Sequence, residues 1–265
     1  MPSETIDFTH LMGCVGSVAA PLLVDVRRAQ DFAADPVMLP GSFRGDPEQW
    51  GDWAVALPPD QDIVVYCVHG HSVSQNAAAA LRGLGLKARP LAGGIAEWRK
   101  RGGPIVAPQR PATLEGRPSA WITRERPKID RIACPWLIRR FIDPRAVFLY
   151  VPVDAVAAVA ETTGAVPYDV SGATLGHQGE GCSFDAFIAQ FGIVDPALDR
   201  LADIVRGADT GRPELTPQSP GLLAMSYGLS ALYPDDHAML EQGMLFYDTL
   251  YAWCRGQAQA AARPS

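Results

Sequence analysis

The segment from Asp62 to Leu84 constrains the fold of this 265-residue chain more than any other. Its first residues, Asp62-Ile63-Val64-Val65-Tyr66, form a short apolar run that predicts a buried strand. A loop of small and polar residues follows directly at Cys67, and a helix-forming run begins at Ser72. A strand that passes through so short a loop into a helix is typical of layered α/β folds.

The neighbouring residues repeat this alternation. We expect further strands at Leu22–Val26 and Ala88–Leu91, and helices at Ser72–Leu84 and Gly94–Arg101. Continuous apolar strands separated by helices predict a parallel sheet flanked by helices.

Repeated proline and glycine between residues 102 and 118 forbid a continuous helix or inner strand. We therefore expect an α/β domain over residues 1–107, a linker over 108–118 and a second domain over 119–255. The Ala/Gln-rich residues 256–265 are expected to form a disordered tail.

The second domain is predicted to be mainly α-helical. Asp195-Pro196 has the form of a helix cap followed by a first-turn proline. The expected helices are Phe184–Phe191, Ala197–Arg206, Leu222–Leu232 and a long amphipathic run over Asp235–Cys254, and the expected strands are Trp121-Ile122 and Val147–Val151.

Composition excludes several classes of protein. A net charge of −6 argues against a general nucleic-acid binder. The sequence shows no signal-peptide pattern and no run long enough to span a bilayer, so we expect a cytoplasmic protein without a membrane partner. The five cysteines are widely spread and form no C-x-x-C pair, which favours a reducing compartment.

Cys67 is the candidate nucleophile. It faces the positive end of the predicted helix, a position that favours a thiolate and can hold an anion on backbone N–H groups. The alternative is a small buried hydrophobic residue. The substrate-binding candidates are the residues of the loop and first helical turn: Val68, His69, Gly70, His71, Ser72 and Val73. For His69 and His71, solvated loop residues are the equal alternative.

Four motifs follow one another in the first domain: Leu23-Val24-Asp25-Val26-Arg27, Leu39-Pro40-Gly41-Ser42, the Cys67–Ser72 loop, and Leu91-Ala92-Gly93-Gly94-Ile95-Ala96-Glu97-Trp98. Together they resemble a single-domain rhodanese, a sulfurtransferase. The resemblance implies that Cys67 takes sulfur from a small donor, thiosulfate or a persulfide, and passes it to a thiol or cyanide acceptor. Many thiosulfate-using members have an arginine in this loop. This chain has none, which favours a persulfide donor.

Long motifs in the second half include Arg126–Asp143, Gly176–Asp185, Ile204–Thr210 and Asp235–Leu240. They resemble the C-terminal domain of chromate-resistance regulators of the ChrB type. This resemblance implies chromate resistance or sensing but no defined reaction. The usual N-terminal region of these regulators is replaced here, so DNA-binding control is not carried over.

Two sites are candidates in the second half. A basic stretch from Arg124 to Arg145 could bind an oxyanion such as chromate, with Arg131, Arg139 and Arg140 as candidates, or form a solvated face. The candidate metal ligands for Fe, Mn or Zn are His177, Asp209, Asp236, His237 and Glu241. Helix caps and turn residues are the alternative, and no cofactor is certain.

Two main functions follow from these patterns, and a redox enzyme whose helical domain acts through a metal centre on chromate or a sulfur compound is a third, weaker alternative. The first is a cytoplasmic sulfurtransferase that forms a persulfide on Cys67 and is coupled to a helical chromate-resistance domain. The second is a sensor or binding module for chromate or metal stress, in which the rhodanese-like domain is only a scaffold.

Overall fold

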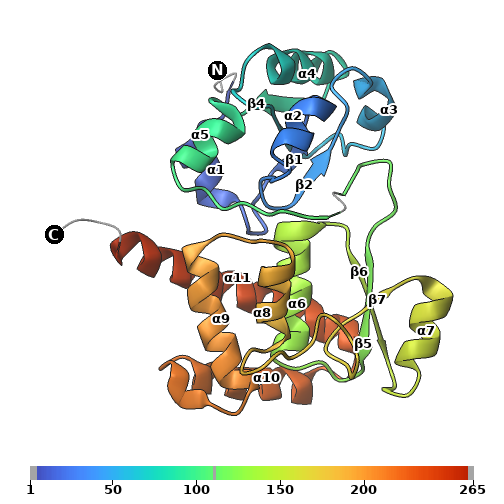
Figure 1. The fold of residues 1–265 in the computed structure, drawn as a ribbon, viewed down its shortest axis with the longest axis vertical. Coiled ribbons are helices and arrows are strands. Elements are labelled where there is room, and N and C mark those ends of the chain that lie inside the picture. The colour runs from blue at the N-terminus through green and yellow to red at the C-terminus, as the bar shows by residue number, and fades with distance from the viewer. Residues whose placement is uncertain (1–4, 110–111, 262–265) are drawn as a thin grey trace. The chain divides into compact units, whose positions relative to one another are not determined.

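The computed structural model describes residues 5–109 and 112–261, and the chain divides into two compact units (Figure 1). The first unit runs to Pro118 and includes Arg139–Pro144 and Phe191–Ile193. The second holds Ser119–Ile138, Arg145–Gln190 and the chain from Val194 onward. The expected linker belongs to the first unit, and its residues 110 and 111 lie outside the described residues.

A four-stranded sheet forms the centre of the first unit. Its strands are β1 (Leu22–Asp25), β2 (Ser42–Arg44), β3 (Asp62–Tyr66) and β4 (Lys87–Pro90), in the order β2-β1-β3-β4. All neighbours are parallel, and Val24 of β1 pairs with Phe43 on one side and Val65 on the other. The predicted parallel α/β layer is confirmed.

Helices bury both faces of this sheet. Side chains alternate along a strand, so Val24 and Val65 face one cluster, which contains Trp53. Leu23 and Val64 face the opposite cluster. The helices of the unit are α1 (Phe8–Cys14), α2 (Ala29–Ala34), α3 (Trp50–Ala54), α4 (Ser72–Gly83) and α5 (Gly94–Lys100).

The second unit has a small parallel sheet of its own. It consists of β5 (Ala120–Arg124), β6 (Val147–Val151) and β7 (Val166–Pro167), in the order β6-β5-β7. Helix α7 (Val156–Thr163) covers one face, where Val156 packs near Ile122. On the other face, Trp121 contacts Phe187 with ring centroids 5.4 Å apart.

Helices make up most of the second unit, as predicted. Helix α6 (Asp130–Leu137) packs against α8 (Ser183–Gln190), α9 (Pro196–Asp209) and α11 (Asp236–Ala261). Its Trp136 is fully buried among the rings of Phe184, Tyr247 and Tyr251. The remaining helical elements are η1 (Ile138–Ile142), η2 (Pro213–Leu215) and α10 (Ser219–Leu232).

A proline inside α6 is accommodated by a tyrosine. Pro135 has no N–H, so the carbonyl of Arg131, four residues earlier, lacks its helical donor. The hydroxyl of Tyr168 donates to that carbonyl at 3.4 Å. The helix then passes into the π-helical turn η1.

Some boundaries differ from the expected ones. Asp195 caps α9 as expected, accepting a hydrogen bond from the N–H of Ala197. Helix α10 begins at Ser219, earlier than expected, and β7 and α7 carried no recognised signal. Helix α11 continues to Ala261, so the expected tail is helical up to that residue. Its last four residues lie outside the described residues. Within residues 5–109 and 112–261, no helix is long and apolar enough to cross a membrane.

Asp195 joins α9 to α11, and this contact predicts a stability effect. Its carboxylate caps α9 and also accepts from the buried hydroxyl of Tyr251. Asp195→Ala removes the cap and leaves that hydroxyl unpaired, so we expect a loss of about 2–4 kcal/mol in the free energy of unfolding. Urea denaturation measures it. Asp199→Ala, on the exposed side of the same helix, is the control and should cost under about 1 kcal/mol. Equal losses in the two variants would contradict this account.

Candidate functional site

Cys67 lies where β3 ends and the chain turns into α4, at the carboxyl edge of the parallel sheet. Its side chain is buried to 6% exposure, and its Sγ lies 3.2 Å from the Oγ of Ser74 in the first turn of α4. A pocket of about 230 Å³ opens beside it. The lining residues are Arg27, Asp31, Cys67, Val68, His69, His71, Ser72 and Val73. The thiol is therefore buried, and a small pocket borders it.

Helix α5 holds the backbone of this loop. The N–H of Ile95 donates to the carbonyl of Cys67, and the N–H of Ala96 donates to the carbonyl of Val68, both at 3.0 Å. These donors come from the first turn of α5, where helical N–H groups have no partner inside the helix. Because the two carbonyls point toward α5, their peptide planes are fixed.

Two glycines permit this close approach. Gly70 has a φ of +70°, and a Cβ there would lie 2.5 Å from the carbonyl oxygen of Leu91. A Cβ on Gly94 would lie 2.3 Å from the carbonyl oxygen of Cys67. Real Cβ atoms do not approach backbone atoms so closely, so glycine is required at both positions.

A buried ion pair forms part of the wall of this pocket. Arg27 is 1% exposed and forms an ion pair with Asp25, which is fully buried. The guanidinium also donates to the carbonyls of Asp35 and Val37. Arg27 thus lies in the pocket wall, paired with Asp25, which also forms an ion pair with Arg44. His69 and His71 are exposed, with ring centroids 5.9 Å apart.

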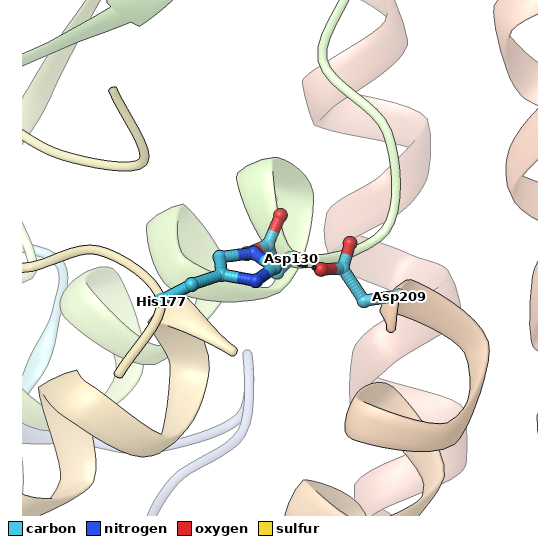
Figure 2. A group of neighbouring side chains, drawn as sticks. All are labelled: Asp130, His177 and Asp209. Carbon is cyan, nitrogen blue, oxygen red and sulfur yellow. Dashed lines mark ion pairs between the residues drawn. The ribbon is translucent and has the colours of Figure 1, made fainter. Parts of the chain in front are cut away.

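A second group of titratable side chains lies in the second unit. The Nε2 atom of His177 lies 3.0 Å from Oδ2 of Asp209, 3.3 Å from Oδ2 of Asp130 and 3.4 Å from Oδ1 of Asp169. Figure 2 shows the side chains of Asp130, His177 and Asp209 pointing toward one another. We call these three residues the His–Asp cluster.

The members of the cluster come from separate elements. Asp130 opens α6, Asp209 closes α9, and His177 lies in the loop between β7 and α8. The sequence predicted His177 and Asp209 as ligands, but neither Asp130 nor Asp169. One signal was present, because Asp169 follows the carboxyl end of a parallel strand, where sites of α/β proteins commonly lie.

The charges of the cluster interact strongly. Hydrogen bonding to Asp130 raises the pKa of His177 to about 9, against the opposing effect of burial. Burial and the nearby carboxylate of Asp130 raise the pKa of Asp209 to about 7. Burial also raises the pKa of Asp169, which forms ion pairs with Arg124 and Arg131. In the absence of another cation, protons are therefore retained among these groups near neutral pH.

The other expected metal ligands lie elsewhere. Asp236 accepts a hydrogen bond from the N–H of Arg126, whose guanidinium donates to carbonyls at the end of α10. His237 is exposed, with its ring against Tyr150. Glu241 is exposed one turn further along α11. The structure thus brings His177 and Asp209 together with Asp130, and leaves Asp236, His237 and Glu241 outside the cluster.

The arginines expected to bind an oxyanion have different surroundings. Arg131 forms an ion pair with Asp169 at 3.2 Å and donates to the carbonyls of residues 124, 125 and 126. Arg139 and Arg140 are half-buried in η1 and belong to the first unit. Arg131 therefore supports the loop that contains Asp169.

Comparison with known proteins identifies relatives of both parts. Residues 121–254 match the family model of the ChrB C-terminal domain, and residues 11–101 match that of the rhodanese-like domain. Protein ChrB of Cupriavidus metallidurans is 37% identical over 142 residues, which are 53% of this chain and 42% of that protein. The chain thus spans less than half the length of that relative.

A sulfurtransferase of Allochromatium vinosum is 34% identical over 105 residues, which are 39% of this chain and 95% of that protein. Among solved structures, a rhodanese-related protein from Thermoplasma volcanium shares 25% identity. That match covers 39% of this chain and 98% of the other, with a TM-score of 0.35.

The five thiols should differ in reactivity. Burial raises the pKa of Cys134, Cys182 and Cys254, and all three side chains are almost completely inaccessible. Cys67 opens to a pocket, and Cys14 is partly exposed. We expect iodoacetamide at pH 8 to alkylate Cys67 and Cys14 in the folded protein at least about tenfold faster than the other three. Peptide mass mapping over time measures the rates, and equally rapid labelling of Cys134 would contradict this ranking.

Gly94→Ala should disturb the Cys67 loop, although the two residues lie far apart in the sequence. The new methyl group would collide with the carbonyl of Cys67, and a positive φ disfavours alanine, so we expect a loss of about 2–4 kcal/mol in unfolding free energy. The alkylation rate of Cys67 should change in the same variant. The control is Gly83→Ala at the end of α4, where a Cβ meets nothing within 4 Å. Unchanged alkylation and stability in Gly94→Ala would show that the loop does not depend on this contact.

Proposed function

Because the chain belongs to the family of the ChrB C-terminal domain over residues 121–254 and contains a rhodanese-like domain over 11–101, we propose that it is a sulfurtransferase in which Cys67 carries the sulfur. The observation that supports this most is the position of the thiol. It lies in a strand-to-helix turn, beside a small pocket, with the loop carbonyls held by α5.

The first step is attack by the Cys67 thiolate on the outer sulfur of a donor. A new S–S bond forms, and the donor's own S–S bond breaks. The leaving group departs with the electron pair, as sulfite from thiosulfate or as a thiolate from a persulfide. In the second step an acceptor thiolate attacks the outer sulfur of the Cys67 persulfide, and the Cys67 thiolate leaves.

Two features of the site support this chemistry. The Ser74 hydroxyl lies 3.2 Å from the sulfur and can donate to a thiolate there. The N-terminus of the 12-residue helix α4 adjoins the same loop and stabilises negative charge. We expect these donors to stabilise the negative charge that develops on the sulfur, since the loop itself contains no arginine.

The donor is inferred from the charge of the pocket. Thiosulfate is a dianion, and the arginine in the pocket wall, Arg27, already pairs with the buried carboxylate of Asp25, which it shares with Arg44. Asp31 adds a further carboxylate to the lining. A persulfide carries less charge, so we favour a small-molecule persulfide as donor and a thiol as acceptor. Five free thiols agree with a reducing compartment such as the cytoplasm.

Cys67→Ser tests the proposal directly. A serine hydroxyl cannot form a persulfide, so sulfur transfer should fall to background with both donors while the circular dichroism spectrum is retained. Mass spectrometry of the donor-treated wild-type protein should show one added sulfur atom on the peptide containing Cys67. The control, Cys14→Ser, changes another accessible thiol and should retain full turnover.

Two outcomes would overturn this function. Retained turnover in Cys67→Ser would place the chemistry elsewhere. No transfer by the wild-type chain with either donor would favour the alternative, in which the rhodanese-like domain is a scaffold for a sensor of chromate or metal stress.

A further inference from the structure

The His–Asp cluster has the composition and spacing of a metal site. One atom from each of Asp130, His177 and Asp209 lies within 4.8 Å of the others. We propose that these three residues bind a divalent transition-metal ion, which is a second site, separate from Cys67 and independent of the sulfurtransferase function.

The distances suit a bound ion. Donor atoms that surround a metal at 2.0–2.2 Å lie about 3.0–3.5 Å from one another in tetrahedral or octahedral geometry. The Nε2 atom of His177 lies 3.0 Å from the Asp209 carboxylate and 3.3 Å from the Asp130 carboxylate. Both distances from His177 thus lie in the range expected around one ion.

The charge balance also favours a cation. The two neighbouring arginines, Arg124 and Arg131, form ion pairs with Asp169. Asp130 and Asp209 lie against the imidazole of His177, and Arg131 also attracts the Asp130 carboxylate. The Asp130 side chain is 2% exposed and that of Asp209 12%, so solvent screens their charges poorly. A divalent ion would neutralise both carboxylates and leave His177 as a neutral ligand.

The ligands are held in place by their surroundings. Asp130 accepts a hydrogen bond from the N–H of Ser183, and it follows Ile129, whose φ of +47° is unusual for a β-branched residue. The N–H of Ile129 donates to Ser226, and its carbonyl accepts from Tyr247. Contacts on both sides thus keep a strained backbone next to the first ligand, as is common at functional sites.

Solvent reaches the cluster at His177, whose side chain is 45% exposed. A pocket of about 360 Å³ borders His177 and is also lined by Arg124 and Asp169. Three protein ligands leave coordination positions free for water or another small ligand, and Arg124 favours an anionic one. One imidazole nitrogen with two carboxylate oxygens suits Mn²⁺ or Fe²⁺ better than soft-ligand ions such as Cu⁺.

The test is a Mn²⁺ titration of the 265-residue chain after removal of bound metal with a chelator. Electron paramagnetic resonance reports free Mn²⁺, and we expect one bound equivalent per chain. His177→Ala and Asp209→Asn should each weaken binding by at least about 100-fold, since even loss of outer-shell groups costs about 10–100-fold. His237→Ala is the matched control, because it removes an exposed histidine of the same unit from outside the cluster.

Folding is monitored by thermal unfolding of each variant with and without Mn²⁺. We expect Mn²⁺ to raise the melting temperature of the wild type and of His237→Ala, but not of His177→Ala. Binding far below one equivalent in the wild type would overturn the proposal, and so would equal affinity in wild type and His177→Ala. Cys67→Ser should bind Mn²⁺ like the wild type, so the metal site and the sulfurtransferase function can fail separately.

Discussion

The first unit depends on the pair of hydrogen bonds from the opening turn of α5 to the carbonyls of Cys67 and Val68. A helix begins with N–H groups that need acceptors, and here the acceptors belong to the loop that holds the thiol. The N–H donors of α5 and the carbonyl acceptors of the Cys67 loop therefore satisfy each other's hydrogen-bonding capacity. The same contact explains why Gly70 and Gly94 have no side chain, because their backbones approach within the space that a Cβ would occupy. The motif Leu91–Trp98 is thus part of the site, although it lies more than twenty residues from Cys67.

Much of the first unit could be predicted from the sequence because its signals are local. The run from Ile63 to Tyr66 is apolar throughout, as a strand buried on both faces requires, and Cys67 follows it directly. The alternation of strands and helices then left few arrangements other than a parallel sheet. The boundaries of elements that depend on tertiary contacts were harder to predict. The short strand β7 has two residues and is defined by its pairing with β5.

The His–Asp cluster could be predicted only in part, because its members meet through tertiary structure. Asp130 is one acidic residue within a basic stretch, and nothing local distinguishes it from a solvated residue. Its burial follows from the packing of α6 against three other helices. His237 and Glu241 share a helix face, which made them plausible ligands, but spacing within one helix does not determine what that face meets. Asp236 instead holds Arg126 at the end of α10.

The arginines of the basic stretch form ion pairs and hydrogen bonds within the folded chain. Arg124 and Arg131 are drawn to Asp169, and Arg126 donates to the carbonyls that end α10. These three arginines thus pair with acceptors of the same unit. Asp169 forms ion pairs with two guanidinium groups, whereas Asp130 and Asp209 lie against the imidazole of His177, with Arg131 attracting Asp130 from further away. The positive charge is therefore distributed unevenly among three neighbouring carboxylates, which supports the cation site proposed at His177.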